Sequence, residues 1–77
     1  MDEKIGRAFA SAFGVTPEQY SESLTPDQVK GWDSLGHLRL VMALQQEFGF
    51  EFDVDEIMRM ENVAKIKEII AERQVTS

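Results

Sequence analysis

The short segment Gly31-Trp32-Asp33-Ser34-Leu35 holds the residues of this chain whose types and spacing point to chemistry. Asp33 is placed to cap a helix that begins at Ser34, because its carboxylate can accept hydrogen bonds from the N–H groups of the first turn. Ser34 would then lie in that turn, beside the positive end of the helix dipole. A serine hydroxyl held there is well placed to carry a phosphate ester.

A nucleophilic triad is the first alternative, since Ser34 and His37 lie one helical turn apart and next to Asp33. A hydrolase also needs an oriented imidazole and two donors aimed at an oxyanion, and Asp33 is already committed to capping. Trp32 stands where a nucleophile elbow has its first glycine. We therefore expect no catalysis, and we expect His37 to be an exposed surface residue.

Metal and nucleotide sites are also disfavoured. Four acidic side chains cluster at Glu51, Asp53, Asp55 and Glu56, but the glycine and terminal glutamate of a calcium loop are missing at the required offsets. The single histidine has no second ligand at metal-binding spacing. There is no glycine-rich phosphate loop, and the aromatic residues are not interleaved with basic ones. We expect no metal, and we interpret the acidic cluster as a solvated face.

Hydrophobic spacing predicts the helix that must position Ser34. Apolar residues recur at helical intervals as far as Phe48, and Gly49 supplies a left-handed stop. About fifteen residues at about 1.5 Å each give a rod of roughly 22 Å. Residues 2–13 show the same periodicity, and Gly14 ends this first helix.

A long connection, residues 15–33, lies between these two helices and contains both prolines. Thr16 and Thr25 each precede a proline and, three residues on, a glutamine, so each predicts a capped helical turn. The apolar residues expected to tie the connection to the core are Val15, Tyr20, Leu24, Val29 and Trp32. A connection of this length is often functional, and it fits two helices that run parallel.

The last third of the chain predicts two more helices. Phe50-Glu51-Phe52 alternates, but without a second strand it is expected to be a loop that buries one or two phenylalanines. Asp53 and Glu56 resemble a capping box that opens a short helix. Asn62 caps the final helix, and we expect residues 74–77 to fray.

Composition agrees with this outline. The sum is an all-α fold, a small three- to four-helix bundle with a long loop between the first two helices, in a single domain over residues 1–77. A net charge of −6 and a pI of about 4.6 disfavour binding to nucleic acid or to an anionic membrane. Cysteine is absent, and no apolar run is long enough to span a bilayer. We expect the amphipathic N-terminal residues not to be a signal peptide. We expect a monomer of the cytoplasm without membrane insertion.

The segment around Ser34 resembles the phosphopantetheine attachment region of acyl carrier proteins, and the resemblance extends over nearly the whole chain. The residues that carry it are Gly31-Trp32-Asp33-Ser34-Leu35, Leu38, Leu40-Val41-Met42-Ala43-Leu44 and Glu47-Phe48-Gly49. It implies that Ser34, flanked by Asp33 and Leu35, receives 4′-phosphopantetheine from coenzyme A through a separate phosphopantetheinyl transferase of the holo-ACP synthase type. The chain itself would then do no chemistry.

The resemblance also implies a role for the attached arm. Its terminal thiol would carry acyl groups as thioesters between an acyl ligase or acyltransferase and downstream acyl-processing enzymes of a fatty-acid, polyketide or other pathway. Helices that part slightly could shelter the acyl chain. The side chains expected around it are Leu44, Phe48, Phe52, Ile57 and Ile66.

One departure from the family concerns partner recognition. Fatty-acid carriers are typically recognised through acidic residues along the helix after the modified serine, whereas positions five, eleven and twelve residues after Ser34 are Arg39, Gln45 and Gln46. The resemblance, with this departure, favours a specialised stand-alone bacterial carrier read by its own loading enzyme. The residues expected to be read are Gly36, His37, Leu38, Arg39, Met42 and Ile57.

Two alternatives stay open. A peptidyl or aminoacyl carrier of a nonribosomal-type pathway would share the fold and the serine, and the low acidity of the second helix suits it. The other is a helical protein-interaction module in which Ser34 is never modified and only helps to cap its helix.

Overall fold

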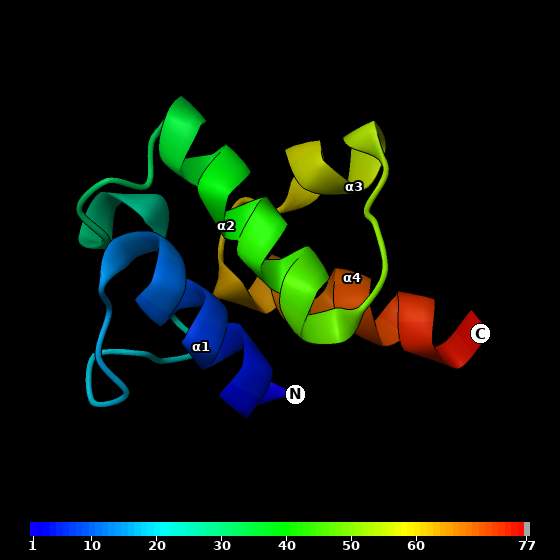
Figure 1. The fold of residues 1–77 in the computed structure, drawn as a ribbon, viewed down its shortest axis with the longest axis horizontal. Coiled ribbons are helices and arrows are strands. Elements are labelled where there is room, and N and C mark those ends of the chain that lie inside the picture. Colours follow the sequence, from blue (N-terminus) through cyan, green and yellow to red (C-terminus); the bar gives the residue numbers. More distant parts are fainter. Residues whose placement is uncertain (77) are drawn as a thin grey trace.

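The fold is a bundle of four α-helices, and the computed structural model describes the backbone of residues 1–76 and the side chains as far as Gln74. Figure 1 shows the helices in chain order. Their bounds are α1 Asp2–Phe13, α2 Ser34–Phe48, α3 Val54–Arg59 and α4 Val63–Thr76, with a 3-10 helix, η1, at Pro26–Gln28. The predicted all-α bundle with a long loop between the first two helices is confirmed.

The ends of α1 and α2 form as the sequence predicts. Gly14 and Gly49 take the left-handed conformation with φ of 71° and 79°, and each ends a helix. At the start of α2, Oδ1 of Asp33 accepts a hydrogen bond of 2.8 Å from the N–H of Gly36. This contact is the N-cap predicted for Asp33, and it fixes where α2 begins.

The two long helices run antiparallel, so the expectation of parallel helices was wrong. Lys4, near the start of α1, lies 5.3 Å from the ring centroid of Phe48 at the end of α2. The loop does travel back along α1, because the hydroxyl of Tyr20 donates a hydrogen bond of 2.9 Å to Asp2. It then returns to the end of α1, where the rings of Trp32 and Phe13 pack with 6.0 Å between their centroids. The loop is long because it covers the core in both directions (Figure 1).

The loop is tied down by the anchors predicted for it. Leu24, Val29 and Trp32 are buried, while Val15 and Tyr20 are half-buried against the core. The N–H of Val63 donates to the carbonyl of Leu24 over 3.1 Å, which joins the loop to the start of α4. Both predicted capped turns are present, and the second of them is η1.

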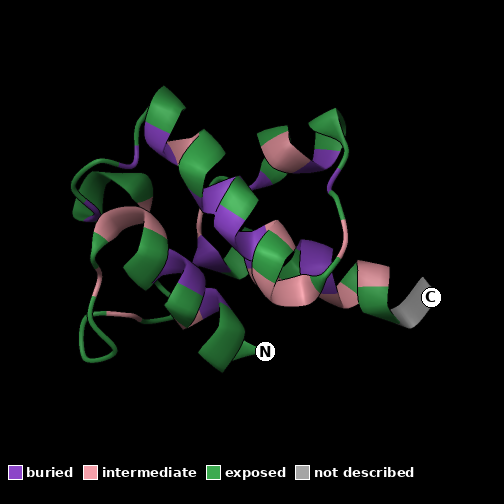
Figure 2. Cartoon of the chain, in the orientation of Figure 1, coloured by how far each residue is buried: buried purple, intermediate pink, exposed green. Residues whose placement is uncertain are grey.

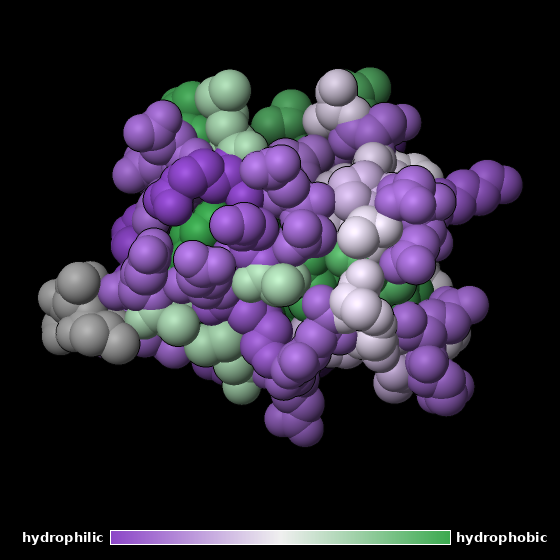
Figure 3. All heavy atoms as spheres, turned by 180° about the vertical axis from the view of Figure 1, so that it is seen from behind, coloured by the Kyte–Doolittle hydropathy of each residue, from purple (hydrophilic) through white to green (hydrophobic). Residues whose placement is uncertain are grey.

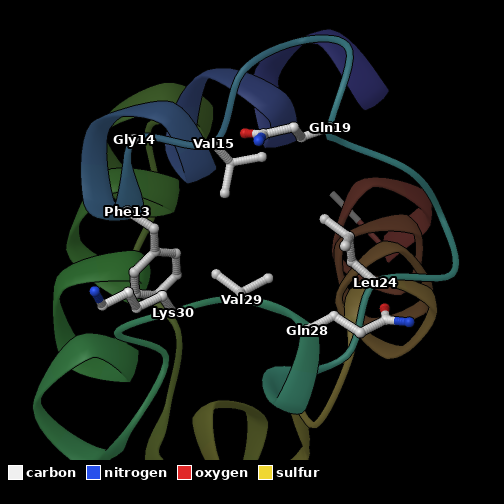
Figure 4. A pocket seen from close by; sticks show the side chains of 8 residues that line it. All are labelled: Phe13, Gly14, Val15, Gln19, Leu24, Gln28, Val29 and Lys30. Atoms are coloured by element: carbon white, nitrogen blue, oxygen red, sulfur yellow. The ribbon is translucent and has the colours of Figure 1, made fainter.

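A hollow remains between the end of α1 and this loop (Figure 4). Apolar side chains from both elements project into it, with polar ones around them. Its lining residues are Phe13, Gly14, Val15, Gln19, Leu24, Gln28, Val29 and Lys30. Ser34 is not one of them, so this hollow is separate from the serine.

The core lies between α1, α2 and α4, with α3 added at one side (Figure 2). Its members are apolar residues at helical spacing, which is why the periodicity of the sequence predicted the elements. The largest fully buried side chains are Ile5, Phe9, Leu40, Leu44, Met60, Val63, Ile66, Ile69 and Ile70. Seen from behind, most of the surface is hydrophilic, and apolar atoms gather at its upper edge (Figure 3).

The last two helices also begin as predicted. Asp53 and Glu56 form a capping box at α3, with the two side chain–backbone hydrogen bonds at 2.8 and 2.9 Å. Oδ1 of Asn62 accepts a bond of 2.8 Å from the N–H of Lys65 and so caps α4. The expected fraying from residue 74 is not observed, because α4 continues to Thr76, and Ser77 lies outside the described residues.

The connection before α3 is a loop, as expected. Phe52 is buried and Phe50 packs partly buried against the core. The guanidinium of Arg73 lies 4.8 Å from the ring centroid of Phe50. Aromatic packing, and not strand pairing, therefore holds this segment in place.

Candidate functional site

Ser34 is the first residue of α2, and its side chain is exposed. The first intrahelical hydrogen bond runs from the N–H of His37 to the carbonyl of Asp33 over 2.7 Å. The carboxylate of Asp33 takes the N–H of Gly36, so the N–H groups of Ser34 and Leu35 are the two left without a helical partner. The serine hydroxyl therefore lies beside two free donors at the positive end of the dipole.

An open depression borders Ser34. It is formed by η1, by the segment that precedes α2, by the first turn of α2, and by the connection between α3 and α4. Its lining residues are Pro26, Trp32, Asp33, Ser34, His37, Met60 and Glu61. The serine thus lies at a junction of four elements and not on an isolated helix end.

Gly36 is buried, which corrects the expectation that a partner reads it. A Cβ atom built on Gly36 would lie 1.7 Å from the carbonyl oxygen of Gly31 and 2.9 Å from a ring carbon of Phe13. Only a residue without a side chain allows the segment before Ser34 to cross the first turn of α2 this closely. Gly36 therefore positions the serine from inside the protein.

His37 is partly buried and fully engaged within the chain, so the expectation of an exposed surface residue was wrong. Its Nδ1 atom lies 2.9 Å from Nε1 of Trp32, and its Nε2 atom lies 2.9 Å from the carbonyl oxygen of Ile57. The two ring planes are nearly parallel, with 6.2 Å between ring centroids and 10° between planes, so the rings lie side by side along this bond. These bonds link α2 to the preceding segment and to α3.

The other predicted recognition residues are accessible to different degrees. Leu38, Arg39 and Met42 are exposed on α2, whereas Ile57 on α3 is half-buried against the core. Five large apolar side chains on these two helices are between 54 and 73% exposed. They are Leu35, Leu38, Met42, Val54 and Met58, and we call them the exposed apolar face. The bond between His37 and the carbonyl of Ile57 places α3 beside the first turns of α2.

The charges of α2 are sparse. Between Leu35 and Phe48 the charged residues are Arg39 and Glu47, and Glu47 pairs with Arg7 on α1 over 3.0 Å. Among the residues whose side chains are described, Arg39 has no ion-pair partner, so the exposed apolar face carries a free cation and no free carboxylate from α2.

Some of the acidic residues after Gly49 have structural roles. Glu56 is buried and pairs with Arg73 at 2.5 Å, and it also caps α3. In the part of the chain that the structure describes, no group of three or more histidine, cysteine or acidic residues could hold a metal ion. The interpretation as a solvated face thus fits Asp53 and Asp55, which are exposed, but not Glu56.

The strongest shifts in pKa lie at the other end of α1, far from the serine in the fold. Hydrogen bonds from Lys67 and then Tyr20 lower the pKa of the Asp2 carboxyl. Hydrogen bonds to Glu22 and then Asp2 raise the pKa of Lys67. Burial, followed by the bond to Asp2, raises the pKa of Tyr20. This cluster joins α1, the loop and α4, so it has a structural role.

Comparison with known proteins decides the family. Residues 3–70 match the family model described as a phosphopantetheine attachment site. The chain belongs to the acyl carrier protein family. An acyl carrier protein of Nitratidesulfovibrio vulgaris (strain Miyazaki F) is 31% identical over 71 residues, which cover 92% of this chain and 90% of that protein. One of Chlamydia muridarum is 27% identical over 74 residues, or 96% of each. No solved structure was found to match the chain significantly.

Membership of the family sets the type of activity. Acyl carrier proteins carry groups on 4′-phosphopantetheine and are not catalysts, and they act with phosphopantetheinyl transferases and acyl-processing enzymes. The residues around Ser34 fit such a group, because an exposed hydroxyl and two free N–H donors suit a phosphodiester anion. None of the helices in the described part of the chain is both long and apolar enough to cross a membrane.

Sequence reasoning located the serine and its cap, but it missed the two residues that hold the site from inside. The sequence predicts Gly36 and His37 only as residues that a partner reads, and His37 as an exposed one. The sequence contains one signal for Gly36, namely a second glycine, Gly31, on the other side of the motif. No comparable signal marks the bond between His37 and Ile57, which are twenty residues apart.

Proposed function

We propose that Ser34 is the residue of this acyl carrier protein that bears 4′-phosphopantetheine. Support comes first from its exposed hydroxyl at the start of α2. The N–H groups of Ser34 and Leu35 are the donors that would hold the phosphate, while Asp33 occupies the N–H of Gly36. A helix N-terminus favours an anion both through its free donors and through its dipole.

In this role the chain binds and presents a group without reacting itself. The attached group would supply a terminal thiol that holds an acyl group as a thioester. Asp33 fixes the first turn of α2, and Gly36 lets the segment before Ser34 lie against that turn. The serine is therefore presented to a transferase from a rigid element, which reduces the conformational entropy lost on docking.

We further propose that the chain is a specialised carrier with its own loading enzyme. The support is the exposed apolar face beside Ser34, together with the free cation Arg39. An enzyme that docks carriers through a basic patch finds no free carboxylate on α2 to attract it. The partner expected here presents an apolar surface to Leu38 and Met42 and a carboxylate to Arg39.

We also propose a domain organisation, an oligomeric state, a location and a set of partners. The chain acts as a single domain over residues 1–77, as a monomer in the cytoplasm. Its partners are a phosphopantetheinyl transferase, an acyl ligase or acyltransferase, and the downstream enzymes of a fatty-acid, polyketide or other acyl-transfer pathway.

Shelter of the acyl chain inside the bundle remains part of the proposal. Leu44, Phe52 and Ile66 are buried in the core, and Phe48 and Ile57 are half-buried at its edge. An acyl chain would enter from the half-buried pair, and the helices must part to admit it. Matched spectra of the apo and acyl-loaded protein would test this, since unchanged methyl and ring signals from these five residues would contradict it.

Intact mass measurement tests attachment directly. The protein is incubated with coenzyme A and a broad-specificity phosphopantetheinyl transferase, with Ser34→Ala as the control. We expect a mass gain of one phosphopantetheine in the wild type and none in the control. No gain with a transferase shown to be active on another carrier would favour the unmodified interaction module.

Steady-state kinetics test the specialised role. Fatty-acid-pathway enzymes should turn over the acyl-loaded protein with a much lower kcat/KM than their usual carrier. Arg39→Glu should raise that kcat/KM, because it restores an acidic side chain on α2. Lys4→Glu makes the same change in net charge at the other end of the bundle and should leave kcat/KM unchanged. Wild-type turnover equal to that of the usual carrier would refute the proposal.

A peptidyl or aminoacyl carrier is the second candidate, and the observation that favours it is the low acidity of α2. Loading assays with aminoacyl-adenylating and fatty-acyl-adenylating ligases distinguish the two. Loading by the aminoacyl ligase alone would select the second candidate.

A further inference from the structure

The imidazole of His37 is held in one protonation state by its two partners. The indole Nε1 of Trp32 can only donate a hydrogen bond, so Nδ1 of His37 must accept it. The carbonyl of Ile57 can only accept, so Nε2 of His37 must carry the hydrogen. The geometry therefore defines a neutral imidazole with its hydrogen on Nε2.

Trp32 transmits this contact to the rest of the site. Its side chain is buried, and its ring packs edge-on against Phe9 with 5.2 Å between centroids and lies 6.0 Å from Phe13. Trp32 comes two residues before Ser34 in the chain. The hydrogen bond to His37 thus links the segment that leads into the serine to α2, while the indole of Trp32 packs on α1.

We propose that His37 is a positioning residue that joins the segment before Ser34 to α3, and that protonation of its imidazole releases Trp32. The consequence for Ser34 rests on the carrier function proposed above. Trp32, His37 and Met60 line the depression beside the serine. The hydrogen bonds of His37 to Trp32 and Ile57 therefore determine the shape of the surface from which an attached arm emerges.

Protonation affects the two hydrogen bonds differently. A proton added at Nδ1 makes both ring nitrogens donors, so Nδ1 no longer accepts from the indole of Trp32 and two N–H groups face each other. The bond from Nε2 to Ile57 persists and becomes charge-assisted. Uptake of one proton therefore separates His37 from the segment before Ser34 while α3 stays attached to α2.

Other titratable groups near the ring must be distinguished from His37 itself. Asp33, before α2, and Glu61, after α3, are the carboxylates that line the same depression. The residues of α1 that pack on Trp32 are the uncharged Phe9 and Phe13, and α3 reaches the ring through a backbone carbonyl.

Two substitutions separate the two bonds. His37→Asn places an amide oxygen near the position of Nδ1, so it retains an acceptor for Trp32 but cannot take up a proton. His37→Gln places an amide nitrogen near the position of Nε2, so it retains the donor to Ile57 and loses the acceptor. His37→Asn therefore keeps the hydrogen bond to Trp32 at every pH, and His37→Gln lacks it at every pH.

The experiment follows the indole N–H signal of Trp32 in two-dimensional ¹H–¹⁵N NMR spectra of the apo protein. Trp32 is the only tryptophan, so this signal is unambiguous. Between about pH 8 and pH 5, the range in which histidines gain a proton, we expect the wild-type signal to move in a single step. The signal of His37→Asn should stay near the high-pH position, and that of His37→Gln near the low-pH position.

Two results of the NMR titration would overturn the proposal. A wild-type signal that does not move over this range would overturn the proposal. A step of equal size in His37→Asn would also overturn it, because the titration would then not belong to His37. The backbone amide spectra of the variants verify that each is folded, and the wild-type titration decides the matter even if one variant is not.

The kinetics of phosphopantetheine transfer test whether the contact between His37 and Trp32 affects Ser34. At pH 7.5 and with a broad-specificity transferase, His37→Gln should be modified several-fold less efficiently than His37→Asn. Equal values for the two variants would refute the positional effect on Ser34. If the wild type is not modified at all, the carrier function fails, while the NMR titration still tests the contact between His37 and Trp32 independently.

Discussion

Gly36→Ala tests the claim that the segment before Ser34 depends on a missing side chain. The new Cβ would lie 1.7 Å from the carbonyl oxygen of Gly31, and real Cβ atoms essentially never come within 3.0 Å of such an atom. The obstacle is backbone, so it cannot rotate away as the end of a flexible side chain would. The crossing segment must move from 1.7 Å to beyond 3.0 Å, and that displaces Trp32 with it.

The expected magnitude combines two opposing effects. Alanine in place of glycine in a helix gains up to about 1 kcal/mol. Overpacking of a tight contact costs about 1–3 kcal/mol, and more where backbone has to shift. Because the clash is with backbone, we take the upper end of this cost and expect a net loss of about 2 kcal/mol in the free energy of unfolding. This loss lowers the Tm of a domain of this size by about 8–16 °C.

Gly6→Ala is the matched control, since it makes the same change inside α1. A Cβ on Gly6 would lie 3.8 Å from the ring of Tyr20, an ordinary contact, so this variant should gain about 0.5–1 kcal/mol. Urea unfolding of both variants, followed by far-UV circular dichroism, gives the two free energies. A Gly36→Ala variant as stable as the wild type would refute the close crossing at Gly31.

Three further predictions concern caps, charge and core. Asp33→Ala should lower the free energy of unfolding by about 0.5–2 kcal/mol, because the N–H of Gly36 loses its cap; urea unfolding measures this loss, and an unchanged midpoint would contradict the cap. The lowered pKa of Asp2 means that the folded chain binds fewer protons than the unfolded chain, so stability is lost as the pH falls below about 4. In thermal melts recorded over a series of pH values, the Tm of Asp2→Asn should therefore fall less steeply in acid than that of the wild type. Parallel curves of Tm against pH would exclude the bond to Lys67 as the cause. Ile66→Ala should cost about 2–5 kcal/mol by chemical denaturation, since Ile66 is fully buried in the core, and a loss below 1 kcal/mol would mean that this part of the core collapses around the gap.

The predictions that succeeded depend on residues close together in the chain. Asp33 and Asp53 cap helices through N–H groups three residues ahead, and Gly49 ends α2 through its own conformation. Such features follow from local geometry, so the helix bounds and the place of Ser34 could be read from the sequence. The sequence predicts the surroundings of Ser34 only within the first turn of α2.

The predictions that failed depend on contacts between distant segments. His37 finds its acceptor twenty residues later, on a helix whose position against α2 no local pattern fixes. The bond to Trp32 spans five residues, which is not a spacing at which helix side chains meet. The direction of α2 relative to α1 likewise depends on how the loop covers the core, and a loop's length alone does not determine its path.

The position of α4 has a consequence for synthesis of the protein. This last helix supplies Val63, Ile66, Ile69 and Ile70 to the core, and the loop joins it through the carbonyl of Leu24. A nascent chain that has reached only Met60 therefore leaves exposed the part of the apolar core that α4 covers. Folding of this carrier must wait until α4 has emerged from the ribosome, so translation sets the earliest moment at which Ser34 is presented for modification.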